Sequence, residues 1–393
     1  MISALNLSGI LLSLGMVVIA MYVIKYACDA FEDASDYLGT DVYKMAPGVR
    51  GATLEAIASS LPELFTTIFL LFVFHDEGGF AAGVATCAGS AVFNAVIIPA
   101  VCILTVTLKG VNGRVVDRLH IQRRTILRDG AFFLLAELCL IFFLGTNQLV
   151  WWMGLVLMAL YGLYFAFLMR SMGVAQEEDS EDDDEEDSAE SPPNLFKILF
   201  TFDFNHLLFQ GREFSPGRAW TVLGCATTTI AAACYLLSES VMLSAAALDV
   251  PPYFTAVILG AAATSVPDTV LSYKDAMKGD YDDAVANAIG SNIFDICVAL
   301  GLPLVLYSGL NILQGQSGHI PLVAAEGAGE GSVQDLRIVL VILSVVIIGT
   351  FLSAKNDTDE DGRSLLLIGK GHGWALIGIY LIWTGFVLSQ MVG

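Results

Sequence analysis

The sequence predicts an all-α integral membrane protein with about ten transmembrane helices, arranged as two inverted five-helix repeats. Of its 393 residues, 55% are hydrophobic, and the mean hydropathy of +0.69 is far above that of a soluble globular chain. Apolar stretches long enough to cross the bilayer core recur about ten times. Two short polar motifs inside these stretches also occur once in each half of the chain. Together these observations define the fold class.

The predicted spans follow one another with five before an acidic segment and five after it. No Lys or Arg precedes the first apolar stretch, so we interpret it as a true span and not as a cleavable signal peptide. The spans are expected at residues 5–26, 50–73, 80–108, 129–145, 149–170, 219–247, 252–273, 282–308, 333–353 and 372–391.

The net charge of −21 belongs largely to one segment outside these spans. Eleven carboxylates lie between Glu177 and Glu190, and such a block is normally solvated and disordered. We therefore predict a first repeat at 1–170, a linker at 171–218 and a second repeat at 219–393. Within the linker, residues 194–209 are expected to form an amphipathic helix at the membrane interface. Docking of a cytosolic regulator such as calmodulin is the alternative for this segment.

The positive charges predict the orientation of the chain. If the N-terminus lies outside and the spans alternate, the basic loops 109–128, 274–278 and 355–370 all face the cytosol, as the positive-inside rule requires. Both termini are then non-cytosolic and the acidic linker is cytosolic. Five spans in each half force the second half to enter from the opposite side, which makes the repeats inverted.

The repeated motifs place acids and hydroxyls in the middle of predicted spans. Ala58-Ser59-Ser60-Leu61-Pro62-Glu63 is echoed 205 residues later by Ala263-Thr264-Ser265-Val266-Pro267-Asp268. The second motif, Gly89-Ser90-Ala91-Val92-Phe93-Asn94, is echoed by Gly290-Ser291-Asn292-Ile293-Phe294-Asp295. A carboxylate at membrane depth is costly and usually functional. The paired motifs therefore predict a site between the two halves.

The chemistry of these motifs is that of a hard cation site. Pro62 and Pro267 should loosen the backbone carbonyls four residues earlier, and Gly89 and Gly290 should let neighbouring helices approach closely. Carboxylates, carbonyls and hydroxyls suit calcium or magnesium, while the absence of thiolates and imidazoles argues against zinc, copper and iron. Three carboxylates exceed the charge of one calcium ion, so a monovalent cation or a proton should balance the remainder. The candidate ligands are Glu63, Asp268, Asp295, Asn94, Ser59, Ser60, Ser90, Thr264, Ser265 and Ser291.

Other polar residues in the spans are weaker candidates. Glu137 and Glu239 are expected to be buried hydrogen-bonding or gating residues, and Glu55 either tunes cation entry or pairs with a basic residue. The seven cysteines have no paired spacing, so we interpret them as small buried residues and not as disulfides or metal ligands.

At these motifs the chain resembles the cation/calcium exchanger superfamily, most closely its potassium-dependent sodium/calcium exchanger branch. The resemblance covers residues 48–105 and 252–306. It rests on Gly51-Ala52-Thr53, on Ser59-Ser60-x-Pro62-Glu63-Leu64-Phe65-Thr66, on Thr264-Ser265-Val266-Pro267-Asp268 and on the two Gly-Ser motifs. The sequence departs from the usual pattern at Ala58 and Ala263, where the family has Gly, at Glu55, and in the smaller residues of 258–262.

The resemblance implies a secondary antiporter that exchanges sodium for calcium, with potassium transported together with calcium. Glu63 and Asp268 would be the central calcium and sodium ligands, Asp295 would carry the potassium requirement, and the other candidates would complete the ion sites. Spans 1 and 6 would form a gate that slides against the other eight. The resemblance implies neither an enzyme nor a cofactor, and we expect no nucleic-acid partner.

Three alternatives remain open at this point. A calcium/proton antiporter would use the same fold, with the site carboxylates taking up protons. A channel-like cation pathway would conduct without a counter-ion. A calcium-sensing scaffold would depend on the acidic tract. The membrane is either the plasma membrane or that of an internal organelle.

Overall fold

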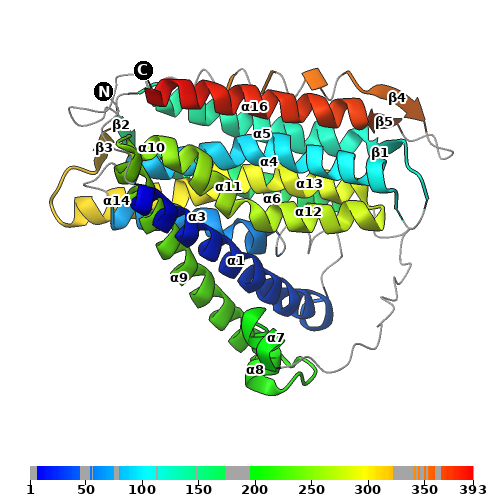
Figure 1. Ribbon diagram of the computed structural model, residues 1–393, viewed down its shortest axis with the longest axis horizontal. Helices are drawn as coiled ribbons and strands as arrows, with labels where there is room; N and C mark the ends of the chain where they lie inside the picture. The colour runs from blue at the N-terminus through cyan, green and yellow to red at the C-terminus, as the bar shows by residue number, and fades with distance from the viewer. Residues whose placement is uncertain are drawn as a thin grey trace.

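The computed structural model describes residues 7–44, 54, 56–74, 79–111, 114–146, 148–172, 195–321, 340–341, 344–345, 349–350, 353–358 and 364–392. Glu55, the tract Glu177–Glu190 and most of the predicted ninth span, 333–353, lie outside these residues. The described chain is overwhelmingly helical (Figure 1).

The helices of the first half match the predicted spans 2 to 5 within several residues, whereas the first helix continues well beyond the predicted end at residue 26. They are α1 (Leu7–Tyr37), extended by the π-helix η1 (Leu38–Val42), then α3 (Ala56–Phe72), α4 (Gly79–Lys109), α5 (Arg123–Leu144) and α6 (Trp151–Met172). Two short helices, α7 (Leu195–Phe200) and α8 (Phe204–Phe209), follow where one amphipathic helix was predicted. Phe202, between them, has a positive φ of 51°, which ends α7.

The second half is more interrupted than the first. It begins with α9 (Pro216–Leu248) and ends with α16 (Lys370–Val392). Between them lie α10 (Pro252–Thr255), the π-helix η4 (Ala256–Gly260), α11 (Ala261–Thr264), α12 (Val266–Lys278), α13 (Tyr281–Phe294), the π-helix η5 (Asp295–Ala299) and α14 (Gly301–Leu313).

Length and composition make these helices membrane spans. Six described helical segments are long and apolar enough to cross a bilayer, or seven if the bent pair Pro252–Thr264 and Val266–Lys278 counts as one span. Helix α3 is a shorter apolar helix. Many large apolar side chains point outward, such as Val18 at 64% exposure and Ile382 at 75%, which is expected where lipid is the solvent. The predicted multi-pass, all-α membrane class is confirmed.

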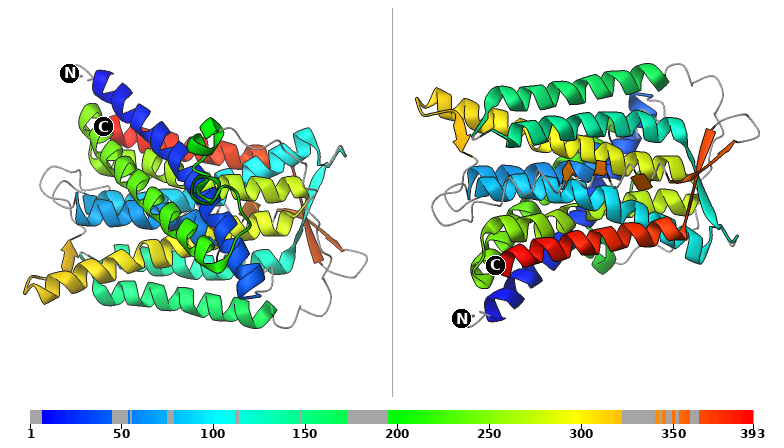
Figure 2. Two further views of the ribbon diagram at one scale, coloured as in Figure 1. Left: turned by 90° about the horizontal axis from the view of Figure 1, so that it is seen from below. Right: turned by 90° about the horizontal axis from the view of Figure 1, so that it is seen from above.

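The packing of the helices follows the inverted repeat, which relates span 3 to span 8 and span 5 to span 10. Helix α4, the third span, packs along α16, the tenth, just as α14 of the eighth span packs along α6, the fifth. Helices α1 and α9, the first span of each half, pack against each other. This α1–α9 pair crosses one face of the bundle obliquely, whereas the other long helices run nearly parallel (Figures 1 and 2). Helix α1 begins and α16 ends at the same end of the bundle.

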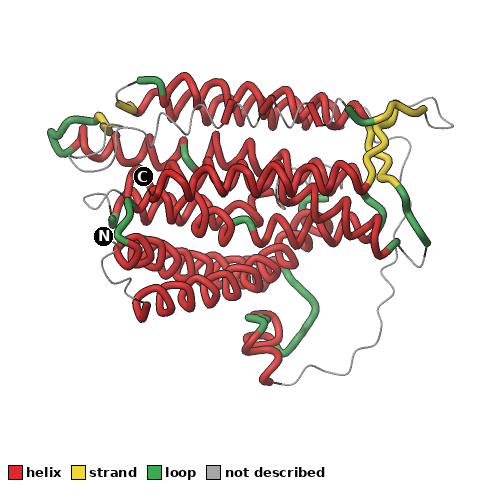
Figure 3. The backbone as a smooth tube through the Cα atoms, turned by 45° about the horizontal axis from the view of Figure 1, so that its top comes forward, coloured by secondary structure: helices red, strands yellow, loops and turns green. Residues whose placement is uncertain are grey.

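Short strands, which the sequence analysis missed, connect the loops at the two ends of the bundle. One antiparallel sheet has the order β1-β5-β4, from β1 (Arg118–Gln122), β5 (Ser364–Gly369) and β4 (Lys355–Thr358). At the opposite end, β2 (Gln148–Val150) pairs with β3 (His319–Pro321) (Figures 1 and 3).

The two sheets also follow the inverted repeat. The first sheet joins the loop between spans 3 and 4 to the loop between spans 9 and 10. The second sheet joins the loop between spans 8 and 9 to the loop between spans 4 and 5. The inverted repeat relates these two pairs of loops to each other. Each sheet therefore pairs only loops that the charge pattern predicts on the same side. The available signal for β1 was the alternation of apolar Leu119 and Ile121, both buried in the structure, with polar neighbours. This alternation covers too few residues to stand out within a basic loop.

Helices α7 and α8 attach to the α1–α9 pair. Phe204 packs with Ala34 and Leu38 at the end of α1 and with Val222 on α9, in a small apolar cluster separate from the main core. The hydroxyl of Tyr22 on α1 donates to the carbonyl oxygen of Phe200 at 2.9 Å. In Figure 1 the α7–α8 pair lies beside the lower end of α9. Its position at the membrane interface stays a prediction.

Candidate functional site

All ten predicted site residues lie together in the centre of the bundle. Helix α3 carries Ser59, Ser60 and Glu63, and α4 carries Ser90 and Asn94. The second half supplies Thr264 and Ser265 at the end of α11, Asp268 on α12, Ser291 on α13 and Asp295 at the start of η5. Nine of the ten side chains are 0% exposed and Ser59 is 3% exposed. The two repeats thus contribute to one buried polar cluster.

The hydroxyl of Ser90 is the centre of this cluster. Its Oγ lies 3.1 Å from Glu63 Oε1, 2.8 Å from Ser265 Oγ and 2.9 Å from Asp295 Oδ2. Asn94 Nδ2 also approaches Ser90 Oγ at 3.4 Å. One hydroxyl has one proton to donate, so it cannot donate to both carboxylates at once. The Ser265 hydroxyl, 3.5 Å from Glu63 Oε1, is the second donor at this point. Two hydroxyl protons thus face two carboxylates, which a cation or a further proton between these oxygens would stabilise.

Asp268 is held by donors from both repeats. Asn94 Nδ2 donates to its Oδ2 at 3.1 Å, and Ser291 Oγ donates to its Oδ1 at 2.7 Å. Asn287, which the sequence analysis did not single out, donates to the Asp268 carbonyl oxygen at 3.4 Å and to Ser272 Oγ at 2.9 Å. Its signal in the sequence was its position three residues before Gly290, which corresponds to that of Thr86 before Gly89.

Several buried oxygens of the cluster have no partner within the part of the chain that the structure describes. Glu63 Oε2, Asn94 Oδ1 and Asp295 Oδ1 accept no hydrogen bond there. The ion pairs among the described residues include none of the three site carboxylates. Buried carboxylates without a basic partner are strongly unfavourable unless cations or protons neutralise them. The donor set, all oxygen and formally −3, fits the hard cations predicted from the sequence.

The acids alone do not form a metal site. Among the described residues, no group of three or more His, Cys, Asp or Glu side chains is arranged to hold a metal ion. Ser90 and Asn94 lie between the carboxylates. The neutral hydroxyl and amide oxygens must therefore belong to any cation site here.

Only one of the two proline motifs interrupts its helix. Helix α3 continues from Ala56 through Pro62 to Phe72, whereas the second half breaks at Ser265 (φ −78°, ψ 4°) with a bend of 40°. Pro267 lies in the first turn of the new helix α12, where proline is well accommodated. The two proline motifs therefore differ in helix geometry, and the loosening of the carbonyls four residues before each proline stays a prediction.

The two motif glycines also differ. A Cβ added at Gly89 would collide with the Val257 carbonyl oxygen and come within 2.8 Å of Ala261 Cβ, so α4 contacts η4 and α11 directly there. A Cβ added at Gly290 would meet only Tyr164 Oη, at 3.8 Å. The prediction of close helix approach is confirmed for Gly89 and wrong for Gly290, because α13 faces a side chain of α6 at this point.

Two of the weaker candidates, Glu137 and Glu239, form no hydrogen bond with the cluster within the described part of the chain. Glu137 on α5 is buried and hydrogen-bonds the hydroxyl of Ser344 in the ninth-span segment, which fits the structural role expected for it. Glu239 is partly buried on α9. Asn292, 0% exposed, has no hydrogen-bond partner for its amide nitrogen or oxygen among the described residues, although the sequence analysis treated it only as part of a motif.

Inverted helical repeats around a buried, negatively charged oxygen cluster define a membrane ion transporter. The chain belongs to the sodium/calcium exchanger protein family, which matches residues 12–170 and 218–389. Members of this family are transporters and not enzymes, in agreement with the prediction.

The chain is similar to named exchangers over different lengths. It is 24% identical to human sodium/potassium/calcium exchanger 5 over 364 residues, covering 75% of this chain and 70% of that protein. It is 34% identical to mouse sodium/potassium/calcium exchanger 4 over 151 residues, 38% of this chain but only 22% of that relative.

Solved structures share the fold. The sodium–calcium exchanger NCX_Mj aligns over 95% of this chain and 97% of its own, with 20% identity and a TM-score of 0.52. The H+/Ca2+ exchanger CAX aligns over 99% and 89%, with 15% identity and a TM-score of 0.56.

Proposed function

We propose that the protein is an antiporter that exchanges sodium for calcium across a membrane and transports potassium together with calcium. Family membership supports cation/calcium exchange. The observation that carries the proposal is the buried cluster of Glu63, Asp268 and Asp295, contributed by both repeats, with acceptor oxygens that lack partners among the described residues. The names of the relatives, sodium/potassium/calcium exchangers, support the choice of ions.

The charge of the cluster accounts for obligatory exchange. An empty site would carry three uncompensated carboxylates in a medium of low dielectric constant. This charge strongly opposes any conformational change during which the site is closed to water. One calcium ion and one monovalent cation neutralise the formal charge, and a sodium load that competes for the same oxygens does the same. Only the ion-loaded protein can change the side to which its site is open, so calcium must be exchanged for sodium.

The moving part in this proposal is the α1–α9 pair. The pair packs along its own length and lies across the remaining helices, so it can slide as a unit against them. Helices α3, α4, α11, α12 and α13 and the π-helix η5 hold the ligands and stay together. On the basis of the basic loops, we place the β1-β5-β4 end in the cytosol, with both termini on the other side.

The direct test is calcium uptake into sodium-loaded proteoliposomes, with either potassium or an inert cation outside. We expect uptake that requires both internal sodium and external potassium. Sodium-driven uptake that is indifferent to potassium would remove potassium from the proposal. Uptake that ignores sodium would contradict it.

A second candidate, calcium/proton antiport, is favoured by one feature of the site. Ser90 Oγ lies within 3.1 Å of both Glu63 Oε1 and Asp295 Oδ2, and a proton on either carboxyl group would complete these contacts. Calcium uptake driven by a proton gradient in sodium-free vesicles would identify this mechanism.

Neutralising Asp295 is expected to separate potassium from calcium. The Asp295→Asn substitution keeps side-chain volume and an oxygen near Ser90, but removes the charge that a monovalent cation would balance. We expect sodium-driven calcium uptake to persist while its stimulation by potassium falls at least tenfold. Uptake by this variant should be titrated with external potassium. An unchanged potassium dependence would exclude Asp295 as its origin.

A further inference from the structure

The boundary between the α1–α9 pair and the other helices carries an ion pair at one end. Lys274, near the end of α12, places Nζ 3.5 Å from Asp29 Oδ1 and 3.9 Å from Glu32 Oε2, both on α1. The other oxygen of Asp29 pairs with Lys25 on α1 at 2.5 Å. One lysine from the ligand-bearing helices thus joins a row of charges on the moving helix, at the end predicted to face the cytosol.

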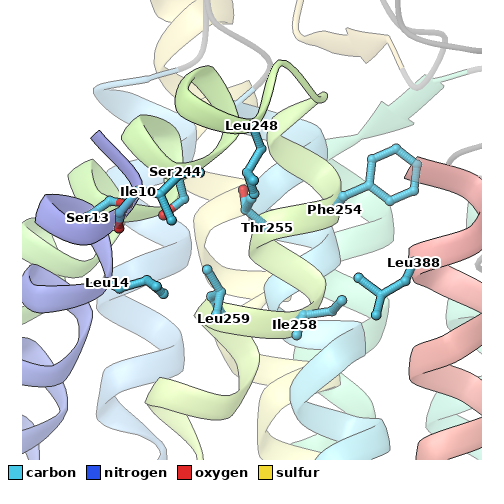
Figure 4. Close-up of a pocket in the computed structure, with 10 residues that line it drawn as sticks. All are labelled: Ile10, Ser13, Leu14, Ser244, Leu248, Phe254, Thr255, Ile258, Leu259 and Leu388. Atoms are coloured by element: carbon cyan, nitrogen blue, oxygen red, sulfur yellow. Dashed lines mark hydrogen bonds between the residues drawn. The ribbon is translucent and has the colours of Figure 1, made fainter. Parts of the chain in front are cut away.

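The opposite end of the same boundary is apolar and loosely filled. A cavity of about 210 Å³ lies there between α1, α9, α10, η4 and α16 (Figure 4). No charged residue lines it, and Figure 4 shows side chains from both sides of the boundary around it. The lining residues are Ile10, Ser13, Leu14, Ser244, Leu248, Phe254, Thr255, Ile258, Leu259 and Leu388. This end has spare volume and no ionic contact among these residues.

We infer that Lys274 is a positioning residue of the exchange cycle, which holds α1 against α12 and favours the state that is closed at the cytosolic end. The inference rests on the proposed sliding of the α1–α9 pair. Such sliding must lengthen the contacts of Lys274 with Asp29 and Glu32, whereas the cavity at the other end can absorb a shift. Lys274 touches no ion in this scheme. It acts through the position of α1.

The expected effect is modest because the ion pair is partly in water. The side chain of Lys274 is 44% exposed, and those of Asp29 and Glu32 are 28% and 22% exposed. Pairs of this kind shift an equilibrium by roughly two- to fivefold. A shift toward the cytosol-open state raises apparent calcium affinity on the cytosolic side and lowers it on the other. A general structural defect would weaken both.

The test is the Lys274→Gln variant, measured in vesicles of known orientation. We expect the half-saturating calcium concentration to fall about two- to fivefold on the cytosolic side and to rise on the other. Lys274→Arg, which keeps the positive charge facing Asp29 and Glu32, should behave as the parent. Lys355→Gln, which removes an exposed charge from β4 at the same end, is the matched control. Affinities unchanged on both sides, or weakened on both, would overturn the inference.

A distance measurement makes the result independent of which ions are exchanged. Spin labels at Thr40→Cys in η1 and Asp280→Cys after α12 report the separation of the two sides, with the singly labelled proteins as background. Lys274→Gln should enlarge the long-distance population, whereas Lys274→Arg should leave it as in the parent. An unchanged distribution would contradict the positioning role even if exchange itself behaves as proposed. A shifted distribution without sodium-driven uptake would instead contradict only the proposed function.

Discussion

Asp268→Asn is expected to reduce sodium-driven calcium uptake by at least a hundredfold. Asp268 is 0% exposed and accepts hydrogen bonds from Asn94 and Ser291, so the amide keeps the shape of the site but removes one of its charges. Removing one partner of a buried charge interaction costs about 3–5 kcal/mol, which corresponds to roughly a hundredfold or more in affinity.

Two readouts separate loss of binding from loss of folding. Calcium should raise the unfolding temperature of the parent protein in detergent, because a ligand stabilises the state that binds it, and this shift should disappear in Asp268→Asn. Asp283→Asn removes an exposed carboxylate from the start of α13 and should keep both uptake and the calcium shift. Parental uptake by Asp268→Asn would overturn the site assignment.

Gly89→Ala is expected to be strongly destabilising, whereas Gly290→Ala should be tolerated. A methyl group at Gly89 collides with the backbone of η4 at Val257 and with Ala261. Backbone atoms cannot rotate away, so α4 must move. Overpacking of this kind costs about 1–3 kcal/mol, and the movement displaces the adjacent Ser90 from Glu63 and Asp295.

The comparison of these two glycine variants is internally controlled, because the residues occupy equivalent positions in the repeats. Thermal unfolding in detergent should show a lower midpoint for Gly89→Ala than for Gly290→Ala, and calcium uptake should fall only in the former. Equal behaviour of the two variants would contradict the close packing of α4 on η4.

Much of the architecture is readable from local properties of the chain. Hydropathy identifies the spans because each helix must satisfy its own backbone in lipid. The odd number of spans per half predicts inversion from counting alone. The acids and hydroxyls of the site stand out because such groups are rare at membrane depth. All ten predicted residues are buried, and side-chain hydrogen bonds join seven of them.

What the sequence determined by itself is therefore the membrane class, the inverted repeat and the residues of the central cluster. Only the tertiary structure decided that Ser90 bridges Glu63 and Asp295, that Gly89 but not Gly290 touches a neighbouring helix, and that Lys274 reaches α1. It also decided which loops pair as strands. The physical reason is that these contacts join residues far apart in the chain. They depend on the rotation and crossing of helices, which packing sets and a repeated motif does not encode.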